Sequence, residues 1–297
     1  MERKPNMDLA GAAALTVFAV VLGLNQVVIK LSNGGFQPIF MAGLRSAFAF
    51  LVILAWMRYR GVHHGIRRDL LFPGLVLGLL FTFEFVCLYL ALDYTTVSRA
   101  SIIFYSMPVW LTLVAHFLLP GEQMRAPRAL GLALAMAGVI WVLAKPYEGA
   151  EASLFGDLLA LGAALGWGGI ALFLRLHPVS QERPEVQLLW QLGVSMLLLF
   201  ALAPLFGPLT RDLAPIHWAG LAFQVLAVAS FGYLFWFMLL KIYPVSGVAS
   251  FSFLSPVCGV ALGWLVLGEE IGPEIIGGLC LVAVGLVLIN RKPRIPR

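Results

Sequence analysis

The chain has 297 residues, of which 61% are hydrophobic and only 12% charged, with a mean hydropathy of +0.92 and a formal net charge of +5. A soluble domain usually carries about 25% charged residues, so this composition excludes a water-soluble fold and places the chain in a lipid bilayer. The basic residues are scattered over short loops and are not gathered on one face, which argues against a nucleic-acid partner.

Ten apolar segments are long enough to cross a bilayer as helices, since such a helix needs about 20 mostly apolar residues. In chain order they cover residues 8–31, 38–58, 70–92, 97–119, 127–145, 154–175, 185–206, 215–240, 247–268 and 272–290. The strands of a membrane barrel would instead alternate in polarity over about ten residues. The first segment is longer than the apolar core of a cleavable signal, about 7–15 residues, so we expect it to remain as a span. The sequence therefore predicts an all-α integral membrane protein.

Lysine and arginine residues predict the orientation of the chain. Of the 20 such residues, 15 fall on the side that holds both termini, 4 on the other side and one, Arg45, inside a span. Cytoplasmic loops carry an excess of Lys and Arg, so both termini are predicted to be cytoplasmic. Aromatic residues anchor helices at membrane faces, and four tryptophans are predicted to do so: Trp56, Trp141, Trp218 and Trp264.

Residues 97–122 and 245–270 resemble each other when they are aligned at a spacing of 148 positions. The identities are Val97/Val245, Ser98/Ser246, Pro108/Pro256, Val109/Val257, Leu119/Leu267 and Glu122/Glu270. Apolar segments match by chance, so the prolines and glutamates are more informative than the leucines. This similarity indicates that the fourth and ninth spans are equivalent.

The same register extends over the rest of the chain. Pairs spaced by 146 to 149 positions are Asp8/Asp157, Pro38/Pro184, Gly131/Gly278 and Gly138/Gly285. We therefore predict two repeats, residues 1–147 and 148–297, each with five helices. Five crossings leave the chain on the other side of the membrane, so the second repeat must be inverted. Inverted repeats recur in secondary transporters, with the substrate site near the bilayer midplane.

Four features of the chain are the five plus five helices, a proline in the fourth and ninth spans, an arginine in the second span, and Leu-Gly-Glu-Glu at Leu267–Glu270. In these four features the chain resembles the EamA-type drug/metabolite transporters. The resemblance covers essentially the whole chain. The first repeat departs from the pattern, because it ends Leu119-Pro120-Gly121-Glu122 without the doubled glutamate. Within this superfamily the chain is most similar to the exporters of aromatic amino acids. The resemblance implies export of amino acids and similar metabolites across the bacterial inner membrane.

The two repeat-related prolines are candidate hinges. Proline lacks an N–H group, so Pro108 frees the carbonyl of Phe104 and Pro256 frees that of Ser252. A bare carbonyl in hydrocarbon is costly, and Ser101 and Ser252 lie near the kinks. One hypothesis is that the kinked segments line a wet cavity that receives a substrate ammonium group. The alternative is a pair of kinks satisfied by neighbouring helices.

Two ionisable residues lie inside predicted spans. Glu84 falls at the centre of the third span, where a charged group costs several kcal/mol, as an order of magnitude, and marks a functional site by default. We expect it to bind a substrate amine or to carry a coupling proton; the alternative is a protonated carboxyl bonded to a neighbouring helix. Arg45 lies about two turns into the second span and can bind a carboxylate. Alternatively it pairs with Glu84 or extends to the membrane surface.

Amide and aromatic side chains complete the predicted site. Asn25 and Gln26 are adjacent on the first span, so at least one must face protein or water. Aromatic residues inside spans are mostly packing residues, but a subset could line a cavity for a large apolar side chain. The aromatic residues chosen as substrate-binding candidates are Tyr89, Tyr105, Trp110, Trp167, Tyr233 and Trp236.

No motif for enzyme chemistry is present. The sequence lacks a P-loop, a His-Glu-x-x-His motif and a Gly-x-Ser-x-Gly motif, and its three cysteines lie in apolar runs without metal-ligand spacing. We therefore expect a transporter without cofactor or metal that sits in the lipid bilayer, binds a small amphipathic solute and acts as a monomer. The preferred solute is a neutral or aromatic amino acid. An exporter of hydrophobic amines or cations is the alternative, with Glu84 as the counter-charge. An intramembrane enzyme would need a nucleophile and a base that the sequence lacks.

Overall fold

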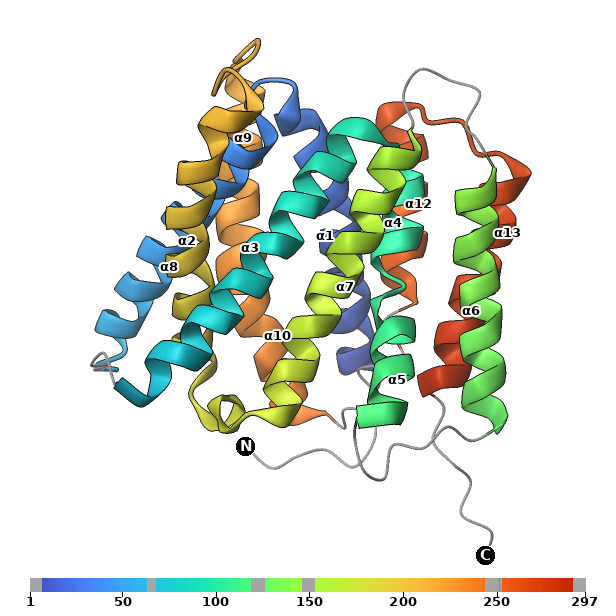
Figure 1. Ribbon diagram of the computed structural model, residues 1–297, viewed down its shortest axis with the longest axis horizontal. Helices are drawn as coiled ribbons and strands as arrows, with labels where there is room; N and C mark the ends of the chain where they lie inside the picture. Colours follow the sequence, from blue (N-terminus) through green and yellow to red (C-terminus); the bar gives the residue numbers. More distant parts are fainter. Residues whose placement is uncertain are drawn as a thin grey trace, which may run out of the picture.

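The computed structural model describes residues 7–62, 68–118, 126–145, 153–243, 251 and 253–290. These residues form a bundle of helices and contain no strand (Figure 1). The α-helices are α1 (Leu9–Asn33), α2 (Pro38–Tyr59), α3 (Leu71–Tyr94), α4 (Val97–Phe104), α5 (Met107–Leu118), α6 (Ala126–Ala144), α7 (Leu154–Leu176), α8 (Pro184–Leu202), α9 (Pro215–Phe223), α10 (Phe231–Ile242), α12 (Leu254–Leu267) and α13 (Pro273–Asn290). Three short 3-10 helices are η1 (Arg68–Leu70), η2 (Pro178–Gln181) and η3 (Ala203–Phe206), and η4 (Gln224–Ser230) is a π-helix.

Within the described part of the chain, nine helical stretches are long and apolar enough to cross a membrane, and the shorter apolar helix α12 adds a tenth candidate. The predicted all-α membrane fold is therefore confirmed. We call the end of the bundle where α1 begins and α13 ends the terminal face; it is the lower end in Figure 1. The other end is the opposite face.

Two predicted spans are interrupted in the structure. The span predicted for residues 97–119 consists of α4 and α5, which are separated at Tyr105 and Ser106. Pro108 lies in the first turn of α5, where the missing N–H group is tolerated. The span predicted for residues 215–240 contains the π-helix η4 between α9 and α10. Both interruptions lie at mid-bundle, where freed backbone groups require partners.

Equivalent helices of the two repeats pack against each other. The pairs are α2 with α8, α4 with α12 and α6 with α13. At the last crossing a Cβ atom on Gly131 would lie 2.7 Å from the carbonyl oxygen of Gly285, and one on Gly138 would lie 2.8 Å from that of Gly278. Since Gly131 corresponds to Gly278 and Gly138 to Gly285, an approximate twofold rotation maps one contact onto the other.

A pair of hydrogen bonds follows the same symmetry and shows that the repeats are inverted. The Thr95 hydroxyl donates to Asp157 over 2.7 Å at the opposite face. The Tyr243 hydroxyl donates to Asp8 over 2.7 Å at the terminal face. Thr95 and Tyr243 are 148 positions apart, and Asp8 and Asp157 are 149 apart. Equivalent bonds therefore lie at the two ends of the bundle.

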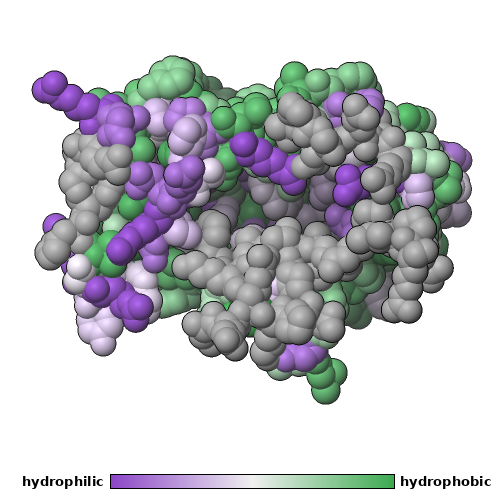
Figure 2. Space-filling view, turned by 90° about the horizontal axis from the view of Figure 1, so that it is seen from below, coloured by the Kyte–Doolittle hydropathy of each residue, from purple (hydrophilic) through white to green (hydrophobic). Residues whose placement is uncertain are grey.

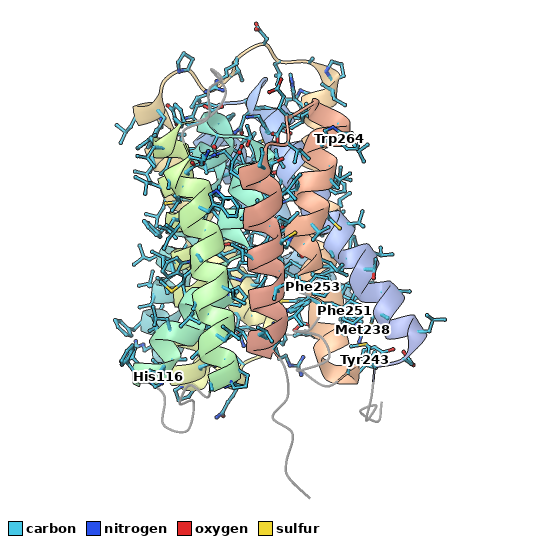
Figure 3. The ribbon with its side chains drawn as sticks, turned by 90° about the vertical axis from the view of Figure 1, so that its right-hand side faces the viewer. His116, Met238, Tyr243, Phe251, Phe253 and Trp264 are labelled. Carbon is cyan, nitrogen blue, oxygen red and sulfur yellow. The ribbon has the colours of Figure 1, made fainter. Side chains whose placement is uncertain are left out.

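The tryptophans predicted as anchors are partly exposed on the outside of the bundle. Trp141, Trp218 and Trp264 expose 41%, 50% and 55% of their surface, and Trp56 is half-buried. Figure 3 places Trp264 near the end of α12 at the opposite face. These positions suit side chains that lie at a membrane boundary.

Candidate functional site

A cavity lies between the two repeats at mid-bundle, and about 170 Å³ of it is open to water-sized molecules. Its walls come from α1, α2, α3, α4, α5, α7, η4, α10, α12 and residues beside them. The lining residues are Leu15, Phe18, Ala19, Leu22, Asn25, Gln26, Arg45, Glu84, Phe85, Leu88, Phe104, Tyr105, Pro108, Trp167, Val228, Tyr233, Trp236, Phe251 and Ser255. The cavity is therefore mostly apolar, with two charged and two amide side chains.

Most of the residues predicted for the site lie around this cavity. They are Asn25, Gln26, Arg45, Glu84, Tyr105, Trp167, Tyr233 and Trp236, with the hinge residue Pro108. Four others are not among the lining residues: Tyr89, Ser101, Trp110 and Pro256. Ser252 lies outside the described residues.

Of the residues outside the lining, Tyr89 and Trp110 form hydrogen bonds elsewhere, and Ser101 lies at a helix crossing. The hydroxyl of Tyr89 donates to Gln224 in the π-helix, and the indole N–H of Trp110 donates to Ser106 over 2.9 Å. Ser101 is fully buried where α4 crosses α12, and its hydroxyl has no hydrogen-bond partner among the described residues.

Arg45 is buried in the cavity wall with part of its guanidinium group unpaired. Its surface is 1% exposed, which contradicts the alternative that it extends to the membrane surface. The guanidinium carbon lies 4.2 Å from the centroid of the Phe85 ring, and Arg45 is within hydrogen-bond reach of Tyr233. Its Nε and Nη1 atoms have no partner among the described residues. Burying unpaired donors is costly, so the group is suited to an acceptor that enters the cavity.

Glu84 lies in the same wall, on α3, and is 4% exposed. The positive charge of Arg45 is close enough to stabilise the negatively charged form of this carboxyl group. A Cβ atom on Gly166 would lie 3.1 Å from the Cα atom of Glu84, so α7 approaches α3 closely here. The glycine allows this approach as small residues do between membrane helices. The cavity therefore contains one buried carboxyl group and one buried guanidinium group.

The amides of α1 supply acceptors without donors. Neither Asn25 Oδ1 nor Gln26 Oε1 has a hydrogen-bond partner among the described residues. Gln26 is within hydrogen-bond reach of the Tyr105 hydroxyl, which donates to the carbonyl of Leu22 over 3.0 Å. A buried acceptor without a donor is costly. The two oxygens are thus suited to a ligand that brings N–H groups.

Two aromatic stacks border the cavity. Phe104 and Trp167 have ring centroids 5.1 Å apart and planes inclined by 20°. Phe18 and Trp236 have centroids 5.4 Å apart and planes inclined by 21°. Phe18 and Trp167 are 149 positions apart, as are Asp8 and Asp157. Equivalent positions of α1 and α7 therefore each present an aromatic face to the cavity.

The apolar lining residues are not among the predicted site residues. On α1 these residues follow one helical face at Leu15, Phe18, Ala19 and Leu22 and lead to the amides at 25 and 26. A helical face of this kind has a period of 3.6 residues. The positions one and two turns before the amide pair, on the same helical face, could therefore have been predicted to line the cavity. On a helix that is apolar all round, lining and lipid-facing residues have the same composition, and only the amides marked the face.

The cavity extends toward the terminal face. Leu15 lies in the first third of α1, Trp236 in the last turns before the terminal end of α10, and Phe251 just before α12. Figure 3 shows Phe251 near Met238 and Tyr243 in the lower part of the bundle. Figure 2 looks onto the terminal face and shows a recess near its centre. Among the described residues, none from the ends of these helices at the opposite face belongs to the lining.

Inverted helical repeats around a buried, mostly apolar cavity are typical of secondary membrane transporters. The comparisons with known proteins agree. The chain belongs to the EamA-like transporter family, whose model matches residues 9–144 and again residues 154–291.

Several bacterial relatives cover nearly the whole chain. A probable amino-acid metabolite efflux pump of Escherichia coli (strain K12) is 28% identical, with 94% of this chain and 93% of the relative covered. The uncharacterized transporter YoaV of Bacillus subtilis (strain 168) is 25% identical, with 91% of this chain and 92% of the relative covered. A solved crystal structure has a TM-score of 0.66 at 19% identity and covers 93% of this chain and 95% of that one. That likeness supports the fold alone.

Proposed function

We propose that the protein exports neutral or aromatic amino acids and related small metabolites across the bacterial inner membrane by alternating access. In this proposal both termini are cytoplasmic, as the distribution of Lys and Arg predicts. The terminal face is then the side from which the solute enters. The printed name of the Escherichia coli relative, a probable amino-acid metabolite efflux pump, supports the same class of solute.

One observation carries the proposal: the cavity holds unpaired donors and unpaired acceptors together. The free N–H groups of Arg45 require an acceptor, and the free oxygens of Asn25 and Gln26 require donors. A zwitterionic amino acid supplies both, since its carboxylate accepts from a guanidinium group and its ammonium donates to amide oxygens. The two aromatic stacks then offer an apolar surface to the side chain of the solute.

A second candidate is export of hydrophobic amines or cations. Glu84 and the aromatic stacks favour it, because a carboxylate and aromatic faces both attract cations. Arg45 disfavours it, because a cation without a carboxylate would bring a second positive charge toward a buried guanidinium group. A solute that pairs with both residues is therefore the better match.

The test compares solutes that differ in one group. The full chain is reconstituted into vesicles, and uptake of phenylalanine is measured with and without a pH gradient. Phenethylamine, which lacks the carboxylate, and phenylpropionate, which lacks the ammonium group, serve as competitors. We expect saturable phenylalanine flux that neither competitor inhibits well. Preferred transport of the amine would replace the proposal by the second candidate, and bond cleavage without flux would indicate an enzyme.

A further inference from the structure

Glu269 is a buried carboxylate outside the proposed solute site. It follows Gly268, which has a φ of +69° and ends α12 in the left-handed conformation that favours glycine. This turn directs the chain back toward α4, so Glu269 is 5% exposed whereas Glu270 is exposed. Glu122 aligns with Glu270 in the repeat register, whereas the neighbouring Glu269 bonds to the first repeat.

The carboxylate of Glu269 caps the first turn of α4. It accepts hydrogen bonds from the backbone N–H groups of Val97 over 2.6 Å and Ser98 over 2.8 Å, and from the Ser98 hydroxyl over 2.6 Å. These N–H groups have no partner within the helix, and a negative charge is favourable at a helix N-terminus. One side chain of the second repeat therefore holds the start of a helix of the first repeat at the opposite face.

Below this cap, two serines of α4 pack against two glycines of α12. A Cβ atom on Gly263 would lie 2.7 Å from a carboxylate oxygen of Glu269 and 3.2 Å from the Ser98 hydroxyl oxygen, and one on Gly259 would lie 2.2 Å from the Ser101 hydroxyl oxygen. Only glycine at position 259 allows this approach. The crossing lies between the cavity and the opposite face, so it separates the two.

The positions of α5 that correspond to these two glycines carry larger residues. At the spacing of 148 that aligns Pro108 with Pro256, Gly259 corresponds to Leu111 and Gly263 to Ala115. Leucine and alanine hold helices further apart than glycine does. The glycines of α12 thus allow a closer approach at the opposite face than Leu111 and Ala115 of α5 would allow at the terminal face.

A second set of bonds fixes α4 to α7 and does not involve α12. Arg99, in the first turn of α4, is paired with Asp157 of α7, with Nη2 to Oδ2 at 2.5 Å and Nε to Oδ2 at 3.0 Å. The same Nη2 atom donates to the carbonyl of Val142 over 2.6 Å. Removing one partner of a buried ion pair leaves an uncompensated charge. Separation of α4 from α12 leaves this pair intact.

We propose that the crossing of α4 and α12 is the gate of the opposite face, that Glu269 holds it closed, and that its closer packing makes the empty transporter rest with the cavity open to the terminal face. The gate must open once in every transport cycle. This inference rests on the proposed transport activity when flux is measured. Chemical labelling of the gate needs no solute and tests the inference independently.

The first experiment locks the gate. In a variant whose three cysteines are replaced by alanine and which retains flux, Ser98→Cys is combined with Gly263→Cys, because these positions are within reach of a disulfide. We expect oxidation to cross-link the pair and abolish flux, and reduction to restore it. The control keeps Cys87 and adds Gly162→Cys across the crossing of α3 and α7, where the new Cβ atom would lie 3.7 Å from the Cβ atom of Cys87. This pair should cross-link without loss of flux. Undiminished flux through the cross-linked gate pair would overturn the inference, as would equal loss in both pairs. Absence of phenylalanine flux in the unsubstituted protein would instead refute the proposed function.

The second experiment measures how often the gate opens. Ser101→Cys is labelled from the opposite face with a membrane-impermeant maleimide. We expect Glu269→Gln to accelerate labelling roughly tenfold, as for the loss of one charge-assisted hydrogen bond, and Gly259→Leu to accelerate it as well. Glu270→Gln is the matched control and should leave the rate unchanged. If Glu269→Gln has the same unfolding temperature and the same labelling rate as its parent, Glu269 does not hold a gate.

Discussion

Replacing Arg45 by glutamine tests whether the guanidinium group binds the carboxylate of the solute. Arg45 has two N–H-bearing nitrogen atoms without partners in the cavity, and a hydrogen bond to a charged group contributes about 1.5–3 kcal/mol. Losing one such bond weakens binding roughly 10- to 140-fold, since each 1.4 kcal/mol is about a factor of ten. We expect the KM for phenylalanine flux in reconstituted vesicles to rise by this factor. Arg45→Lys should give an intermediate KM, because it keeps the charge with fewer donors.

Two controls separate binding from folding. Arg45→Gln leaves Glu84 without its counter-charge, so the double variant with Glu84→Gln shows whether the fold needs the pair. Gln191, which corresponds to Arg45 in the second repeat, does not line the cavity, and Gln191→Ala should leave KM within a factor of about two of its original value, as for a site without solute contact. An unchanged KM in folded Arg45→Gln protein would refute the role of Arg45 in binding the carboxylate. Among the described residues, no other arginine lines the cavity.

Three further predictions concern the cavity and the ion pairs. If Glu84 carries a coupling proton, Glu84→Gln makes phenylalanine flux independent of an imposed pH gradient, whereas an unaltered response excludes that role. Trp167→Ala should raise the KM for phenylalanine by roughly 2- to 12-fold, since an aromatic contact contributes about 0.5–1.5 kcal/mol, and should leave the KM for alanine unaffected; Trp110→Ala, outside the lining, should change neither. Asp157→Asn leaves a buried arginine unpaired and should lower the free energy of unfolding by about 3–5 kcal/mol, whereas Asp93→Asn breaks a half-exposed pair and should cost about 1 kcal/mol or less; equal losses in a denaturation series would contradict this ranking.

The inverted repeat could be predicted from the sequence because prolines and aspartates occupy equivalent positions in both repeats. Pro108 and Pro256 both lie in the first turn of a helix, and Asp8 and Asp157 accept equivalent hydrogen bonds. Such residues have conformational or charge requirements that persist in an apolar background. Span number and orientation depend on the same kind of signal, which is the interruption of apolar composition by charge, Pro or Gly.

The candidate site could be predicted only where a side chain is expensive to bury. Arg45, Glu84, Asn25 and Gln26 stand out from an apolar span, and all four line the cavity. Aromatic residues carry no such cost, so Trp167 and Trp110 could not be distinguished from sequence, although only the first reaches the cavity.

Which of Glu269 and Glu270 is buried could not be predicted from sequence either. The left-handed turn at Gly268 decides which of the two carboxylates points inward. A pattern of residues in a membrane chain thus predicts which groups need a partner, whereas the direction of each side chain depends on backbone turns and on packing between distant helices.

The glycine-lined crossing of α4 and α12 has a kinetic consequence that differs from its structural one. A closed crossing cannot decide the net direction of movement, which follows the gradients of solute and of any coupled ion. It alters the apparent affinity measured from each compartment, because a solute outside the closed end meets a binding-competent carrier only during the fraction of time that this end is open. Half-saturation should therefore need more solute from that compartment than from the other, and the carrier would respond to accumulation on one side while remaining nearly insensitive to the same solute on the other.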